Sequence, residues 1–139
     1  MTDPDRSPAI DVLEAARRLA DGAAGGAAGI AGGESTGGAA SEPLLIDVRE
    51  PAEFAMVRAV GARLLPLSTF LGRYRALPTD RPILLICATG SRSGQAAAYL
   101  LAHGWTDVVN VSGGTAAWQR AGLPTRQGPL QPGEGDLGF

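Results

Sequence analysis

Short apolar runs alternate along the chain with segments whose apolar residues recur every three or four positions. Apolar runs of strand length occupy residues 44–48 (LLIDV), 64–65, 83–86 (ILLI) and 108–111 (VVNV). The run at 83–86 contains no polar residue, which is typical of a strand in a parallel sheet that is covered on both faces. The pattern therefore predicts four short strands, of which ILLI is buried on both sides.

Helical periodicity fills the intervals between these runs. We expect helices over residues 10–20, from Pro51 through Met56, from an N-cap at Ser68 to Pro78, from about Arg92 to Gly104, and after Gly113-Gly114. The expected apolar faces are Val12, Leu13, Ala16, Leu19 and Ala20 in the first helix, and Phe70, Leu71, Tyr74 and Leu77 in the third. Strand and helix alternate, which predicts the α/β class, with a small, mainly parallel sheet and helices on both faces.

Two stretches interrupt this pattern. Residues 21–43 are rich in Gly and Ala and offer little that could pack, so we expect a flexible insertion. Residues 127–139 are rich in Gly, Pro and Gln, and we expect a disordered C-terminal tail. The remaining residues predict a single domain over 1–126.

The charge balance limits the partners. The net charge is −2, from 12 basic and 14 acidic residues, which argues against nucleic-acid binding. No apolar run approaches the roughly 20 residues of a membrane span, and the N-terminus lacks the apolar core of a secretory signal. We therefore expect a cytoplasmic protein without a membrane partner. All the basic residues are arginine, which excludes a Walker A phosphate loop and Schiff-base chemistry on a lysine.

The chain has one cysteine, Cys87, and one histidine, His103. One thiol excludes an intramolecular disulfide, and the pair cannot form a typical zinc site, so we expect neither metal nor cofactor. Cys87 ends the ILLI strand and is followed by a loop of small residues and by Arg92 at the start of a helix. Loop N–H groups and a helix N-terminus both favour thiolate over thiol. We therefore predict that Cys87 is a nucleophile at neutral pH rather than a small buried hydrophobe.

Four groups of residues occur in an order that resembles a known family. They are LIDVREPAEF at 45–54, Gly61-Ala62 with Pro66, Cys87-x-x-Gly90-x-Arg92-Ser93, and Gly113-Gly114 with Trp118 and Gly122-Leu123-Pro124. Together they resemble the rhodanese (sulfurtransferase) domain family in its single-domain form, over about residues 10–124 outside the Gly/Ala stretch. Val57-Arg58-Ala59 stand where the family usually has a Gly-His-Ile-like step.

The resemblance implies a thiosulfate sulfurtransferase that works in two steps. The Cys87 thiolate takes a sulfur atom from thiosulfate or a similar small anionic donor and becomes a persulfide. A thiol or cyanide acceptor, or a partner protein, then removes that sulfur. The residues implied to hold the persulfide and the donor are Ala88, Thr89, Gly90, Ser91, Arg92 and Ser93. Arg92 would hold the anionic donor or stabilise the loop.

Other functions remain open at this stage. Cysteine phosphatases need Cys-x5-Arg, but that arginine position is Ser93, so phosphatase activity is not expected. The domain could instead be a sulfur-relay or binding module with little thiosulfate turnover. It could also be a redox sensor whose lone thiol forms sulfenic acid. Asp47 and Arg49 either line the rim of the site or form an ion pair that fixes the end of a strand.

Overall fold

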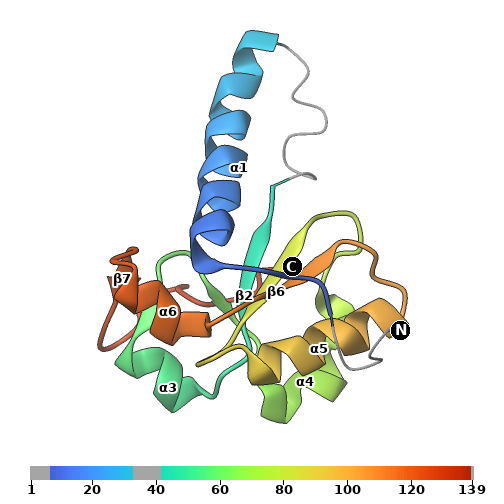
Figure 1. Cartoon of the computed structure of the whole chain (residues 1–139), viewed down its shortest axis with the longest axis vertical. Coiled ribbons are helices and arrows are strands. Elements are labelled where there is room, and N and C mark those ends of the chain that lie inside the picture. The colour runs from blue at the N-terminus through green and yellow to red at the C-terminus, as the bar shows by residue number, and fades with distance from the viewer. Residues whose placement is uncertain (1–6, 33–41, 139) are drawn as a thin grey trace.

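A five-stranded parallel sheet forms the centre of the molecule (Figure 1). The computed structural model describes residues 7–32 and 42–138. The strands are β1 (Ala9–Ile10), β2 (Leu44–Asp47), β4 (Arg63–Leu64), β5 (Ile83–Ile86) and β6 (Val108–Val111), in the order β1-β6-β5-β2-β4. Every neighbouring pair is parallel, and β5 lies between β2 and β6. A separate antiparallel pair joins β3 (Arg58–Ala59) to β7 (Thr125–Arg126).

Helices cover both faces of the sheet. They are α1 (Val12–Gly32), α3 (Pro51–Met56), α4 (Leu67–Arg73), which continues into the 3-10 turn η2 (Tyr74–Ala76), α5 (Ser91–Ala102) and α6 (Gly114–Arg120). One core cluster holds residues of α4 and α5, and the other holds residues of α1, α3 and α6. Successive residues of β5 enter opposite clusters, and all four are buried. The expected α/β class, with a buried ILLI strand, is confirmed.

Helix α1 is longer than the sequence pattern indicated. It continues to Gly32, so the expectation of a flexible segment from residue 21 is wrong for residues 21–32, while residues 33–41 lie outside the described residues. Alanine is the best helix former, and its abundance offsets glycines that cost about 1 kcal/mol each. Buried Val12 and Ala15 anchor the helix to the sheet, and Figure 1 shows its far end extending beyond the body.

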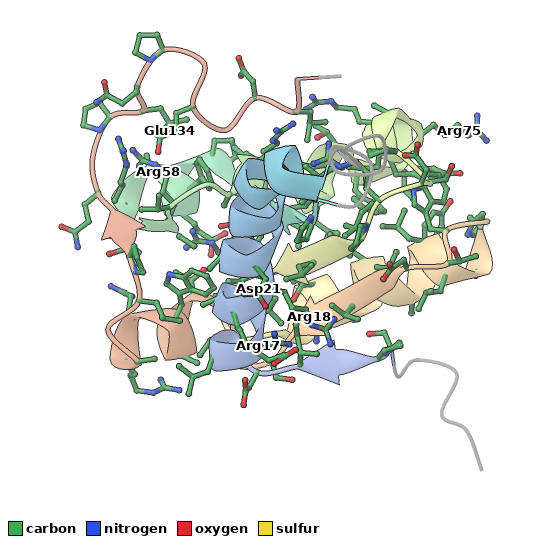
Figure 2. The ribbon with its side chains drawn as sticks, turned by 90° about the horizontal axis from the view of Figure 1, so that it is seen from above. Arg17, Arg18, Asp21, Arg58, Arg75 and Glu134 are labelled. Carbon is green, nitrogen blue, oxygen red and sulfur yellow. The ribbon has the colours of Figure 1, made fainter. Side chains whose placement is uncertain are left out.

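The exposed side of α1 is held by ion pairs. Arg17 bonds Glu14 and Asp21, and Arg18 also bonds Glu14, at 2.6–2.8 Å (Figure 2). The hydrogen bonds from Arg17 and Arg18 hold the pKa of Glu14 at about 2. Pairs at i, i+3 and i, i+4 of this kind stabilise a helix modestly.

Two leucines assigned to apolar faces point outward instead. Leu13 is 61% exposed and Leu71 is 70% exposed. In α1 the packed face is centred on Val12 and Ala15, so Leu13 lies about 100° round the helix from Val12. The buried residues are Phe70 in α4, Tyr74 in η2 and Leu77 just after it, as expected, but not Leu71. A helix this short can bury only a narrow face.

The C-terminal segment is packed, so the expected disordered tail over 127–139 is wrong for residues 127–138. The Leu64 N–H donates to the Gly135 carbonyl at 2.7 Å, which covers the edge of β4. The side chain of Arg63 donates to the Leu137 carbonyl, and Leu137 is buried in the cluster formed with α4 and α5. This segment therefore belongs to the domain that the sequence pattern ended at residue 126.

A buried arginine explains why this polar segment docks. Arg58 is 1% exposed, and its Nε and Nη2 donate to the two carboxylate oxygens of Glu134 at 2.6 and 2.9 Å. Its remaining hydrogens reach backbone carbonyls, among them that of Gly128 at 2.8 Å. Figure 2 shows Arg58 and Glu134 directed toward one another. A buried guanidinium needs such partners, because an unpaired buried charge is costly. The hydrogen bonds from Arg58 also hold the pKa of Glu134 at about 2.

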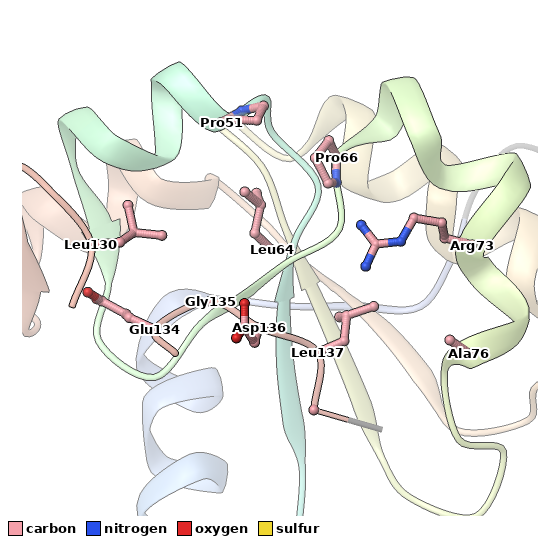
Figure 3. Close-up of a pocket in the computed structure, with 11 residues that line it drawn as sticks. Pro51, Leu64, Pro66, Arg73, Ala76, Leu130, Glu134, Gly135, Asp136 and Leu137 are labelled. Atoms are coloured by element: carbon pink, nitrogen blue, oxygen red, sulfur yellow. The ribbon is translucent and has the colours of Figure 1, made fainter. Parts of the chain in front are cut away.

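The docked segment forms one wall of a cavity of about 630 Å³ (Figure 3). The cavity is lined by Pro51, Leu64, Pro66, Arg73, Ala76, Leu130 and residues 134–138. None of these residues belongs to the loop that carries Cys87. Among the described residues, no helix is long and apolar enough to cross a membrane.

Candidate active site

Cys87 lies at the carboxyl end of β5, the central strand of the sheet. Ligands of open parallel sheets bind at this edge. The loop after Cys87 turns into α5 at Gly90, which has a φ of +105°. A Cβ at Gly90 would lie 3.2 Å from the backbone nitrogen of Gly113. Both the backbone conformation and the close neighbour therefore require glycine here.

Two donors surround the Cys87 sulfur. The Gly90 N–H donates to Sγ at 3.1 Å, and the Ser93 Oγ lies 3.3 Å from Sγ. Burial is the largest single influence and raises the pKa of the Cys87 thiol. The Ser93 hydroxyl and the N–H groups of Ser93, Gly90 and Thr89 together outweigh burial, so the pKa lies below its usual value. The loop therefore favours the thiolate.

Asn110 of β6 positions the serine, and the sequence analysis did not identify it. The Ser93 Oγ lies 2.6 Å from Asn110 Oδ1, and Asn110 Nδ2 donates to the Gly90 carbonyl at 3.0 Å. The amide thus ties the loop to the start of α5. The single hydroxyl hydrogen of Ser93 has two acceptors within reach, Asn110 Oδ1 and Cys87 Sγ. A lone polar residue in the VVNV strand was the available signal.

The helix start after the Gly113-Gly114 turn is hydrogen-bonded to the first residues of the Cys87 loop. The Thr115 N–H donates to the Cys87 carbonyl at 2.8 Å, and the Ala116 N–H donates to the Ala88 carbonyl at 3.0 Å. A Cβ at Gly114 would lie 2.4 Å from the Cys87 carbonyl oxygen. Only glycine permits this approach, which is the physical reason for the second glycine of the motif.

Arg92 is held by a carboxylate of α3. Its Nη1 and Nη2 donate to the two oxygens of Glu53, each at 2.9 Å. Glu53 is also fixed from behind, because the Glu50 N–H donates to Glu53 Oε1 at 2.9 Å in a capping box. The Arg92 hydrogen bonds, with the Glu50 N–H next, hold the pKa of Glu53 at about 2. Of the two roles expected for Arg92, this geometry matches loop stabilisation.

Glu50, at the start of α3, also contacts Ser68, which the sequence predicted as the N-cap of α4. Pro66 occupies the N-cap position of α4, and Ser68 lies inside the first turn. Ser68 instead donates its hydroxyl to Glu50 Oε1 at 2.6 Å. The capping prediction is therefore wrong, because Pro66, with its restricted φ, directs the chain into the helix two residues earlier.

Asp47 and Arg49 form a buried ion pair. Arg49 Nη2 lies 2.9 Å from Asp47 Oδ2, and both side chains are at most 5% exposed. Arg49 also donates to the Val57 carbonyl at 2.6 Å. These contacts agree with the second of the two roles that the sequence left open, an ion pair that fixes the end of a strand.

The other expected loop residues form the surface around the sulfur. Thr89 and Ser91 are exposed, Ala88 and Gly90 are half-buried, and Cys87 itself is 1% exposed. His103 follows the far end of α5, where its ring stacks on Tyr99 at 3.9 Å between centroids. His103 therefore has a structural role at the end of α5 that lies opposite Cys87.

The fold and the loop define an α/β domain with a buried cysteine at the end of a central parallel strand. The sequence profile of the rhodanese-like domain matches residues 35–121, and the chain belongs to the rhodanese-like domain family. It is 43% identical over 81 residues to a protein of Allochromatium vinosum named sulfurtransferase, covering 58% of this chain and 76% of that protein. It is 45% identical over 74 residues to the uncharacterized protein YqhL of Bacillus subtilis, covering 53% of this chain and 59% of that protein.

A solved structure agrees with this assignment. The crystal structure of a rhodanese-related protein from Thermoplasma volcanium superposes with a TM-score of 0.58 at 31% identity. The match covers 60% of this chain and 83% of that protein. The expected family and its fold are confirmed, and the family is one of sulfurtransferases.

Proposed function

We propose that this chain transfers sulfane sulfur through a persulfide on Cys87. The observation that carries the proposal is the position of two donors at the Cys87 sulfur, the Gly90 N–H at 3.1 Å and the Ser93 hydroxyl at 3.3 Å, whose hydrogen is shared with Asn110 Oδ1. Both stabilise negative charge on sulfur, in the thiolate and in the persulfide that follows it. The thiolate is the nucleophilic form of cysteine.

The first half-reaction loads the sulfur. The Cys87 thiolate attacks the outer sulfur of a donor, a new S–S bond forms, and the donor's own S–S bond breaks. With thiosulfate, the leaving group is sulfite, which departs with the electron pair of that bond. Total charge is conserved, because a thiolate and a dianion give a persulfide anion and a dianion. The Ala88–Ser93 loop holds the product.

The second half-reaction unloads the sulfur. A thiol or cyanide acceptor attacks the outer sulfur of the persulfide, and Cys87 leaves as the thiolate. This is covalent catalysis of the ping-pong kind. Cys87 is the sole cysteine in the sequence, so no second thiol of this chain can resolve the persulfide. The acceptor is therefore an external small molecule or a partner protein.

Intact-protein mass spectrometry tests this function. The wild type and Cys87→Ala are each treated with thiosulfate and, separately, with cysteine persulfide. The proposal expects a gain of one sulfur atom in the wild type only, removed by cyanide. No gain from either donor, with the thiol still open to alkylation and oxidised reversibly by peroxide, would favour a redox sensor instead.

A further inference from the structure

The charged groups next to the Cys87 loop are already paired. Both terminal nitrogens of Arg92 donate to Glu53, each at 2.9 Å, and the guanidinium of Arg49 forms an ion pair with Asp47. Two cations and two carboxylates sum to zero charge. The donors that do reach the sulfur, a backbone N–H and a hydroxyl, are neutral.

This balance disfavours a dianionic donor. Thiosulfate carries two negative charges, and it must approach a sulfur that is itself negative when it is reactive. Opposing charges would lower that repulsion, but Arg92 is neutralised by its partner. A persulfide of a carrier thiol, R–S–SH, is neutral at the reacting sulfur when protonated, so it approaches the same thiolate without this repulsion.

Glu53 is placed to keep Arg92 occupied. Exposed ion pairs are usually weak, and the Arg92 and Glu53 side chains are 34% and 38% exposed. Here, however, the carboxylate is fixed by the Glu50 N–H at 2.9 Å and both of its oxygens engage the guanidinium. A donor anion must therefore compete with a preorganised carboxylate for Arg92.

We propose that Cys87 takes its sulfur from the persulfide of a carrier thiol in preference to thiosulfate, and that Glu53 sets this preference by neutralising Arg92. The inference rests on the proposed function. The Cys87 thiolate attacks the outer sulfur of R–S–SH, the Cys87 S–S bond forms, and the R–S bond to that sulfur breaks. The carrier leaves as R–S⁻ with the electron pair, and the proton stays on the new persulfide, Cys87–S–SH, until solvent removes it.

Donor competition tests the inference. The second-order rate constants for loading Cys87 are measured with thiosulfate and with cysteine persulfide, for the wild type, Glu53→Gln and Glu50→Gln. Glu53→Gln keeps the acceptor for the Glu50 N–H but removes the negative charge that neutralises Arg92. Glu50→Gln removes one negative charge from the same helix start and leaves the Arg92 pair intact, which makes it the matched control.

The wild type should load faster from cysteine persulfide than from thiosulfate. Glu53→Gln should raise the thiosulfate rate constant roughly two- to fivefold, the scale of one partly exposed charge pair. The gain should lie in the apparent binding constant and should shrink with added salt. Loading from cysteine persulfide should change less than about twofold, and Glu50→Gln should leave the donor ratio unchanged.

Equal or faster loading of the wild type from thiosulfate would overturn the inference and leave the proposed function standing. So would a thiosulfate rate that rises equally in Glu53→Gln and Glu50→Gln. Loading from neither donor would overturn both. The wild-type donor ratio needs no variant, so the inference stays testable if Glu53→Gln does not fold.

Discussion

Leu137→Ala tests whether the C-terminal segment is a structural part of the domain. Leu137 is 6% exposed and joins the core cluster that contains Phe70 and Leu100. Leu130 lies in the same segment but is 39% exposed, and it provides the matched control. The two variants remove the same atoms from the same stretch of chain, so they differ only in what those atoms contact.

The structure sets the size of the effect. Leu→Ala substitutions in protein cores cost about 2–5 kcal/mol, as lost transfer free energy plus a cavity term. Leu137 is 6% exposed rather than fully buried, so the free energy of unfolding should fall by about 2–3 kcal/mol, at the lower end of this range. That loss corresponds to a decrease in Tm of roughly 6–12 °C for a domain of this size. Leu130→Ala should cost less than about 1 kcal/mol.

Urea unfolding is the appropriate assay, followed by tryptophan fluorescence. Trp105 is 8% exposed and Trp118 is 3% exposed, so both report loss of the core. The reasoning is refuted if Leu137→Ala and Leu130→Ala both unfold within about 0.5 kcal/mol of the wild type. That result would mean that the segment is undocked in solution, as its composition alone indicated.

Three other substitutions test the site and its supports. Asp47→Asn should lower the free energy of unfolding by about 3–5 kcal/mol, because it leaves Arg49 buried without its carboxylate; thermal unfolding measures this, and a loss below about 1 kcal/mol would contradict it. Ser93→Ala removes a donor to sulfur and should raise the pKa of the Cys87 thiol, so alkylation near pH 7 should slow and its pH profile should move upward. An unchanged profile would show that the hydroxyl does not act on the sulfur. Gly114→Ala should both destabilise the domain and slow persulfide loading, whereas wild-type loading rates would contradict the close approach of the two loops.

The periodicity of the sequence was enough to predict β2, β4, β5 and β6 and most of the helices. It did not predict β1, because Ile10 was assigned to the start of the first helix. The ILLI strand is apolar at every position and is buried at every position, because a central parallel strand has helices on both sides. The position of Cys87 at the end of that strand also followed from the sequence. The local sequence pattern predicted the structure correctly where a residue's surroundings are determined by the helix or strand that contains it.

Contacts between distant residues were the parts that could not be predicted. Nothing near Arg58 indicates that its partner is Glu134, 76 residues later. The polar composition of the C-terminal segment suggested disorder, because its docking depends on one buried guanidinium elsewhere in the chain. Asn110 was missed for the same reason, since its link to Ser93 joins two elements that meet only in the folded sheet.

The order in which the strands are assembled has a consequence for folding kinetics. Within the described residues β1 pairs with β6 alone, with Ala9 opposite Asn110, so the first strand cannot join the sheet before β6, the last strand of that sheet along the chain, has formed. Such long-range pairing is entropically slow, and until it forms, the free edge of β6 can template pairing with another chain. Asn110 lies on β6 and contacts Ser93, so the strand whose edge stays open until β1 pairs is also the strand that contributes to the surroundings of the Cys87 sulfur.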